Sequence, residues 1–175
     1  MNRLVIMSMA VLLVTGCSQP VADSEESAMT QAEAGTLSAE EAAQIEREIR
    51  QTVDEYVEAV KAKDIPAALS FWSNTADFVH AGDGKIFGGY EEWSSYVANS
   101  LEAVDEYLYW NNSDIHVVVL ARNAAAYTMN FEVATVTDGE KNEISGSWTY
   151  VFRKSESGWQ VIQSNGAHVG LNYYE

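Results

Sequence analysis

Few acid–base groups of this sequence are candidates for catalysis, and two of them lie in one short segment. His80 and Asp77 are three residues apart in a β-rich run, 76–80, that predicts a strand. Histidine can act as a general base near neutral pH because its ordinary pKa is about 6.5. An aspartate or a tyrosine such as Tyr127 could supply the second proton-transfer group. We therefore take His80, Asp77 and Tyr127 as candidate catalytic residues, although a structural hydrogen bond at a strand end is the favoured role for His80.

The remaining histidines do not extend this candidate site. His116 lies in an apolar run typical of a strand, and His168 follows Gly166 near the end of the chain, where we expect an exposed residue. The three histidines have no regular spacing with respect to one another or to the acids, so we predict no metal site. Residues 81–89, which include Asp83-Gly84, read as a glycine-rich turn. Their glycines do not form a phosphate-binding motif, and we predict no cofactor.

Turn signals indicate which residues share a sheet face. Asp138-Gly139 is typical of a two-residue hairpin, which places Thr137 opposite Glu140 and therefore Tyr127 opposite Tyr150. Directly opposed residues point to the same face of a sheet. This register predicts an aromatic face that the helices cover.

A second turn extends this face to the last strand, "WQVIQSNGAH". A four-residue turn, 155–158, places Tyr150 opposite Gln163 and Trp148 opposite Asn165. A buried amide without a hydrogen bond costs on the order of 1–3 kcal/mol, so tyrosines, water or a ligand must satisfy these two side chains. A mostly apolar hollow with a few polar groups is typical of a small-molecule site. The predicted ligand-binding residues are Tyr127, Trp148, Tyr150, Gln163 and Asn165.

The elements that carry these residues come in the order helices, then antiparallel strands. Ser38 and Glu41 form a capping-box pattern, and apolar residues then recur at helical spacing to about residue 63. A short helix is expected from Asp64-Ile65-Pro66 to residue 72, and a third over 90–103. Strands are expected over 107–120, 124–137, 143–154 and 159–165. This order predicts an α+β fold.

The pattern resembles the SnoaL-like, nuclear transport factor 2-like superfamily over roughly residues 45–169. The segments "VKAKDIPAALSFWSNTADFV", "GGYEEWSSYV" and "GSWTYVFRKSESGWQVIQSNGAH" occur in the order and spacing of that family. The resemblance implies a cone-shaped, strongly curved antiparallel sheet packed on three N-terminal helices (cystatin-like), a pocket between them, and a possible homodimer through the sheet. The last strand of related domains often has histidine where this chain has Gln163 or Asn165. That departure favours binding over acid–base catalysis.

The first residues read as a secretory signal. Arg3, an apolar run over 4–14 and Thr15-Gly16-Cys17 resemble a bacterial lipoprotein signal, in which the cysteine is lipidated. A plain cleaved signal is the alternative. Ser18 follows the cysteine and favours the outer membrane, facing the periplasm. We therefore predict a signal peptide over 1–16, a lipidated Cys17 with a flexible acidic tether over 17–36, and a SnoaL-like domain over 37–175.

Charge excludes some partners. The chain has a formal net charge of −16 and a single cysteine. Because such a surface repels phosphate groups, we expect no nucleic acid partner and no membrane contact except through the anchor on Cys17. The favoured function is binding of a small, partly apolar molecule. An isomerase, dehydratase or hydrolase type of enzyme using the same pocket, and a protein-interaction or dimerisation module without a ligand, remain as alternatives.

Overall fold

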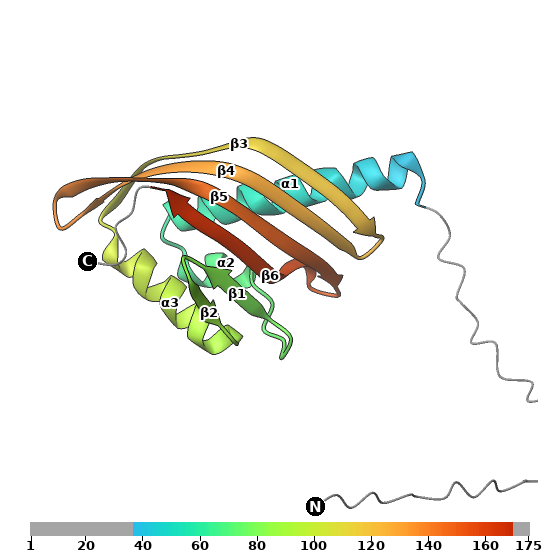
Figure 1. The fold of residues 1–175 in the computed structure, drawn as a ribbon, viewed down its shortest axis with the longest axis horizontal. Helices are drawn as coiled ribbons and strands as arrows, with labels where there is room; N and C mark the ends of the chain where they lie inside the picture. The colour runs from blue at the N-terminus through green and yellow to red at the C-terminus, as the bar shows by residue number, and fades with distance from the viewer. Residues whose placement is uncertain (1–36, 170–175) are drawn as a thin grey trace, which may run out of the picture. The chain divides into compact units, whose positions relative to one another are not determined.

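The computed structural model describes residues 37–169 of the chain. Figure 1 shows long strands curving over helix α1, with two shorter helices and a small hairpin beside them. The predicted signal peptide, the lipidation of Cys17 and the tether lie outside the described residues. Within residues 37–169, no helix combines the length and the apolar character needed to span a bilayer.

Three helices form where caps and apolar spacing predicted them. Helix α1 (Ala39–Lys61) begins at a capping box, in which the Glu41 amide donates to Ser38 Oγ and the Ser38 amide donates to Glu41 Oε2. Helix α2 (Ile65–Ser70) begins after Asp64, whose carboxylate accepts the Ala67 amide. Helix α3 (Tyr90–Ala103) follows Gly89. The residues that these helices bury are Ile45, Ile49, Val53, Val57, Val60, Ala68, Trp93, Val97 and Leu101.

Six strands form one sheet in the order β2-β1-β6-β5-β4-β3. Their bounds are β1 (Val79–Gly82), β2 (Lys85–Phe87), β3 (Glu106–Ala121), β4 (Ala124–Thr137), β5 (Glu140–Ser155) and β6 (Gly158–Val169). The predicted antiparallel meander is β3 to β6. The glycine-rich segment expected to be only a turn forms the β1–β2 hairpin, and β1 pairs in parallel with β6. The sheet is therefore mixed.

The predicted register is correct between β4 and β5 and fails halfway along β6. Tyr127 lies opposite Tyr150, as expected, and Phe152 lies opposite Val161. Beyond that pair Ile162 has no partner on β5, because a β-bulge inserts one extra residue. Every later residue of β6 therefore points to the face opposite to the one predicted.

The bulge lies where the edge partner of β6 changes. The Val161 amide donates to Phe71 O, and Val161 O accepts the Ser73 amide, so the segment 71–73 pairs with the start of β6. From Gln163 onward the partner is β1 instead. The extra residue allows β6 to pair with two different segments on one edge and with β5 on the other.

Candidate functional site

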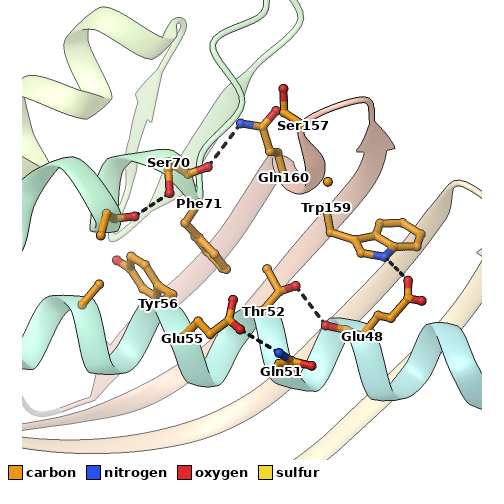
Figure 2. Close-up of a pocket in the computed structure, with 13 residues that line it drawn as sticks. Glu48, Gln51, Thr52, Glu55, Tyr56, Ser70, Phe71, Ser157, Trp159 and Gln160 are labelled. Atoms are coloured by element: carbon orange, nitrogen blue, oxygen red, sulfur yellow. Dashed lines mark hydrogen bonds between the residues drawn. The ribbon is translucent and has the colours of Figure 1, made fainter.

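A groove of about 520 Å³, lined mainly by polar residues, lies between α1, α2 and the β5–β6 turn. Figure 2 shows that its polar side chains already bond within the groove: Trp159 Nε1 donates to Glu48, and Gln51 donates to Glu55. Gln160 likewise donates to the Ser70 carbonyl. Because these groups satisfy one another, they do not converge on a common point where a ligand would need them.

A smaller hollow of about 280 Å³ lies between the sheet, α1 and α3, and aromatic rings form most of its wall. Its lining residues are Tyr56, Trp72, Trp93, Tyr96, Val97, Ser100, Trp110, Met129, Phe131, Ile144, Trp148, Tyr150 and His168. We call it the aromatic cavity. It is the better candidate site, because a concave, mostly apolar hollow with few polar groups is the usual form of a small-molecule site.

The rings of this wall hold one another in place. Tyr56 stacks on Phe71 with ring centroids 4.1 Å apart, and Trp72 packs edge-on against both Trp93 and Tyr150. Such edge-to-face pairs contribute about 0.5–1.5 kcal/mol beyond their burial. The cavity is therefore a preformed feature of the core.

Burial keeps the tyrosines of this region neutral. Burial, together with the neighbouring tyrosines Tyr56 and Tyr127, raises the pKa of Tyr150 well above its usual value. Burial, and to a lesser extent the negative charge of Asp54, raises the pKa of Tyr127 to about 12. These hydroxyls can donate hydrogen bonds at neutral pH but cannot act as bases there.

A histidine–aspartate pair closes one end of the aromatic cavity. Because of the bulge, β6 directs His168 to the concave face, where Phe131 and Trp148 contact its ring edge-to-face. His168 Nδ1 lies 2.5 Å from Asp83 Oδ2, and the His168 amide donates to Asp83 Oδ1 over 2.9 Å. Burial raises the pKa of Asp83, but the two hydrogen bonds from His168 outweigh this effect and hold it below its usual value.

A second, fully buried histidine lies behind the same wall. His80 stacks on Trp93 with centroids 3.7 Å apart, and its Nδ1 lies 2.5 Å from Ser164 Oγ. Burial lowers the pKa of His80 from 6.5 to about 4, with a further decrease from His168 and an opposing increase from Asp83. His80 is therefore neutral at pH 7 and has the structural hydrogen bond that the sequence analysis favoured, with Ser164 as its partner.

Sequence comparison identifies the family to which this arrangement belongs. Residues 49–168 match the SnoaL-like domain family, which is most of the chain. The chain belongs to the SnoaL-like domain family. No curated protein sequence matches it.

Solved structures confirm the fold of this SnoaL-like domain. A nuclear transport factor 2-like superfamily protein from Salmonella enterica shares 13% identity, with a TM-score of 0.65, over 75% of this chain and 99% of its own. A ketosteroid isomerase-like protein from Erwinia carotovora shares 20% identity, with a TM-score of 0.58, over 71% of this chain and 96% of its own. At these identities the likeness shows the α+β cone fold with its curved sheet, and nothing about activity.

The SnoaL-like domain brings only part of the predicted site together. Trp148 and Tyr150 line the aromatic cavity, whereas Tyr127 is buried in the core and does not line it. Gln163 and Asn165 were predicted to face the aromatic wall, and this prediction is wrong: the bulge turns both to the opposite face, where they are exposed.

The candidate catalytic residues are also separated. Asp77 pairs with Arg153 on the surface over 2.7 Å, and this contact holds the pKa of Asp77 well below its usual value. His80 lines a neighbouring hollow of about 220 Å³ with Asp83 and Lys85, but not the aromatic cavity itself. Among residues 37–169 no group of three or more side chains could hold a metal ion.

Sequence reasoning missed Asp83 and His168 as site residues. Asp83-Gly84 was taken only as a turn signal, and His168 only as an exposed residue. One signal was available, because an Asp-Gly pair between two β-rich runs is typical of a hairpin. Such a hairpin would have placed a carboxylate at the end of an extra pair of strands.

Proposed function

We propose that this SnoaL-like domain binds a small, uncharged, partly apolar molecule in the aromatic cavity. The observation that carries the proposal is a hollow of about 280 Å³ that is walled by aromatic rings and closed by His168. A flat ring would contact several of these side chains at once, and its burial contributes roughly 25 cal/mol per Å² of apolar surface. An anionic ligand is disfavoured because the whole chain carries a net charge of −16.

Polar groups in the wall support a ligand that carries an oxygen or nitrogen acceptor. The indole N–H groups of Trp93 and Trp148 are buried and have no hydrogen-bond partner among the described residues. A buried donor without a partner costs about 1–3 kcal/mol. A ligand acceptor bonded to either N–H would recover part of this cost.

Calorimetric titration with 1-naphthol, an uncharged bicyclic probe, tests the proposal. Ser100 is exposed on α3 at the edge of the cavity, so Ser100→Phe should obstruct it without disturbing the core. Asn99→Phe is the matched control, since Asn99 is an exposed neighbour that does not line the cavity. We expect binding to the parent and to the control, and at least tenfold weaker binding to Ser100→Phe. Equal affinity in all three proteins would contradict the proposal.

The outer face of the sheet supports a second role, as a dimer interface. Val118 and Leu120 on β3 are 54% and 59% exposed. Val118 lies opposite Ala126 on β4, which in turn lies opposite Val151 on β5. This uncharged row would become buried if two copies packed sheet to sheet. We expect Val118→Lys to shift a dimer to monomer in light scattering, whereas Ile86→Lys, at an exposed position on β2, should not. A monomeric parent protein would exclude this role.

We also propose that the domain is tethered to the cell envelope through a lipid on Cys17, and that Ser18 favours the outer membrane facing the periplasm. The support is the signal-like composition of residues 1–17. Several acyl chains on one cysteine would give stable anchoring, whereas a single chain is marginal. Mass spectrometry of the N-terminal peptide should find acylated Cys17, and Cys17→Ala should release the protein from membranes. An unmodified cysteine within a soluble mature protein would exclude the anchor.

A further inference from the structure

The aromatic cavity continues towards the β4–β5 turn as a second hollow of about 340 Å³, which we call the outer hollow. The two hollows share four lining residues, namely Trp110, Phe131, Ile144 and His168. The other residues that line the outer hollow are Val104, Tyr107, Val133, Thr135, Thr137 and Asn142. Because the same side chains belong to both walls, a ligand that fills the aromatic cavity can extend into the outer hollow.

The first row of the wall beyond Phe131 is apolar. Residues two apart on a strand share a face and lie about 7 Å apart, so Val133 follows Phe131 outward along β4. Val133 lies opposite Trp110 on β3 and opposite Ile144 on β5. The indole N–H of Trp110 already donates to Asn112 Oδ1. This row therefore offers a ligand apolar contact and no hydrogen bond.

The next row outward is polar. Thr135 lies opposite Tyr107 on β3 and opposite Asn142 on β5, about 14 Å beyond Phe131 along β4. Thr135 is only 5% exposed, so its hydroxyl is a buried group of the hollow. Burial raises the pKa of Tyr107 to about 12, and its phenol is therefore neutral and able to donate a hydrogen bond at pH 7. Two hydroxyls and an amide in one row can both donate to and accept from a ligand.

Charged side chains are missing from both walls. None of the described residues that line the aromatic cavity or the outer hollow is Asp, Glu, Lys or Arg, although charged residues make up 21% of the chain. In contrast, Glu48 and Glu55 line the groove beside α2, and Asp83 and Lys85 line the hollow beside His80. A charged ligand group would lose its water in the two joined hollows without gaining an ionic partner. The wall therefore favours a ligand that is uncharged along its whole length.

The segment that follows α3 closes the outer hollow on one side and is held firmly in place. Lys63 Nζ donates to the carbonyl of Val104. The Asp105 amide donates to Val136 O, and Asp105 Oδ2 accepts the Gly139 amide from the β4–β5 turn. These bonds tie the segment to the end of α1 and to the outer end of the sheet. The outer hollow is therefore formed before a ligand arrives.

We propose that the outer hollow is a chain-binding subsite, and that the ligand is an elongated, uncharged molecule with a ring at one end and a polar group at the other. The ring lies in the aromatic cavity, and an unbranched saturated chain lies on the apolar row of Val133. A terminal hydroxyl or amide reaches the polar row of Thr135. This inference rests on the proposed ligand binding in the aromatic cavity, and it adds the length of the ligand and the chemistry of its far end.

Calorimetric titration with 3-phenyl-1-propanol and 6-phenyl-1-hexanol tests the subsite, because the two probes share a ring and a hydroxyl and differ only in chain length. Each methylene that becomes buried contributes about fourfold in affinity. We expect the longer alcohol to bind the parent protein at least tenfold more tightly than the shorter one.

A variant that fills the outer hollow separates this subsite from a general preference for apolar probes. Asn142 is exposed and lines the outer hollow but not the aromatic cavity, so Asn142→Phe should remove the advantage of the longer alcohol. Asn111→Phe is the matched control, because Asn111 is an exposed residue on β3 that lines neither hollow. The control should keep the advantage, and the affinity for 1-naphthol should be the same in all three proteins.

Thr135→Val tests the polar end, since it removes a hydroxyl with little change of shape. It should weaken binding of 6-phenyl-1-hexanol about fivefold, which is the usual contribution of one neutral hydrogen bond, and leave 3-phenyl-1-propanol unaffected. Tyr107→Phe takes its place if Thr135→Val does not fold. Unchanged affinity for the longer alcohol would overturn the role of the polar row.

The outcomes separate this inference from the proposal on which it rests. If 1-naphthol binds but the two alcohols bind equally well, or if the advantage of the longer alcohol survives Asn142→Phe, the chain-binding subsite is overturned and the binding proposal stands. If neither 1-naphthol nor the alcohols bind, ligand binding in the aromatic cavity and the inference that rests on it are both overturned.

Discussion

His80 should make the stability of the domain depend on pH in a window that its carboxylates alone do not explain. The side chain is 2% exposed, stacks on Trp93 and lies 2.5 Å from Ser164 Oγ. Burial lowers the pKa of His80 from 6.5 to about 4, although the negative charge of Asp83 acts in the opposite direction and raises it. Because the folded-state pKa is depressed, the unfolded chain binds a proton first as the pH falls. The stability that neutral His80 contributes is complete above pH 6.5 and is lost between pH 6.5 and pH 4.

The size of this effect follows from the two pKa values. Each unit of difference corresponds to about 1.4 kcal/mol, so by pH 4.5 the free energy of unfolding should fall by about 2.5 kcal/mol through His80 alone. His80 lines a hollow of about 220 Å³, and screening by solvent in that hollow reduces this figure, so we expect about 2 kcal/mol. With a urea m value on the order of 2 kcal/mol/M, the midpoint of unfolding should fall by roughly 1 M.

Urea denaturation of the parent protein and of His80→Gln, at pH 7 and at pH 4.5, measures this contribution. Glutamine keeps a hydrogen-bonding group near Ser164 but cannot take up the proton, and the titration of every carboxylate is common to both proteins. The parent protein should therefore lose about 2 kcal/mol more than the variant over this interval. Parallel losses in the two proteins would refute the reasoning, because they would show that His80 is protonated equally easily in the folded and unfolded chains.

The remaining predictions concern β6. Gly166→Ala should lower the free energy of unfolding by about 1–3 kcal/mol, because a Cβ at Gly166 would lie 2.2 Å from the Trp148 ring, whereas Gly88→Ala meets nothing within 4 Å and serves as the control. Urea denaturation measures both, and equal stability of the two variants would contradict the prediction. The double substitution of Gln163 and Asn165 by leucine should leave 1-naphthol affinity in calorimetry unchanged, because both side chains are exposed on the far face. Weakened binding would show that they contact the ligand after all.

Elements whose signals are local could be predicted from the sequence. The capping box at Ser38 and the hairpin at Asp138-Gly139 each use side chains or φ angles within a few residues, and the structure has both. The β4–β5 register followed from that hairpin alone and is correct from Thr137 to Tyr127. A tight turn is sufficient because it fixes the pairing of the residues next to it, and each further pair follows by alternation.

The site could not be predicted because it depends on contacts between distant segments. The residue opposite Tyr150 is Ser164, because a bulge follows Val161, the residue that pairs with Phe71 and Ser73 on its other edge. No spacing within residues 158–169 signals that pairing. For the same reason the parallel contact of β1 with β6, which brings Asp83 to His168, has no local signal.

The bulge at Ile162 therefore decides the chemistry of the aromatic cavity. In an unbulged strand the alternation would direct Gln163 and Asn165 inward, and this part of the cavity wall would have two amides in place of a histidine. One extra residue turns both amides outward, places Gly166 under Trp148 and directs His168 to the cavity, where Asp83 holds it. Bulges are frequent next to active sites because they change the direction of a side chain without changing the rest of the sheet. The histidine that was missing from the predicted wall is therefore one that the bulge supplies.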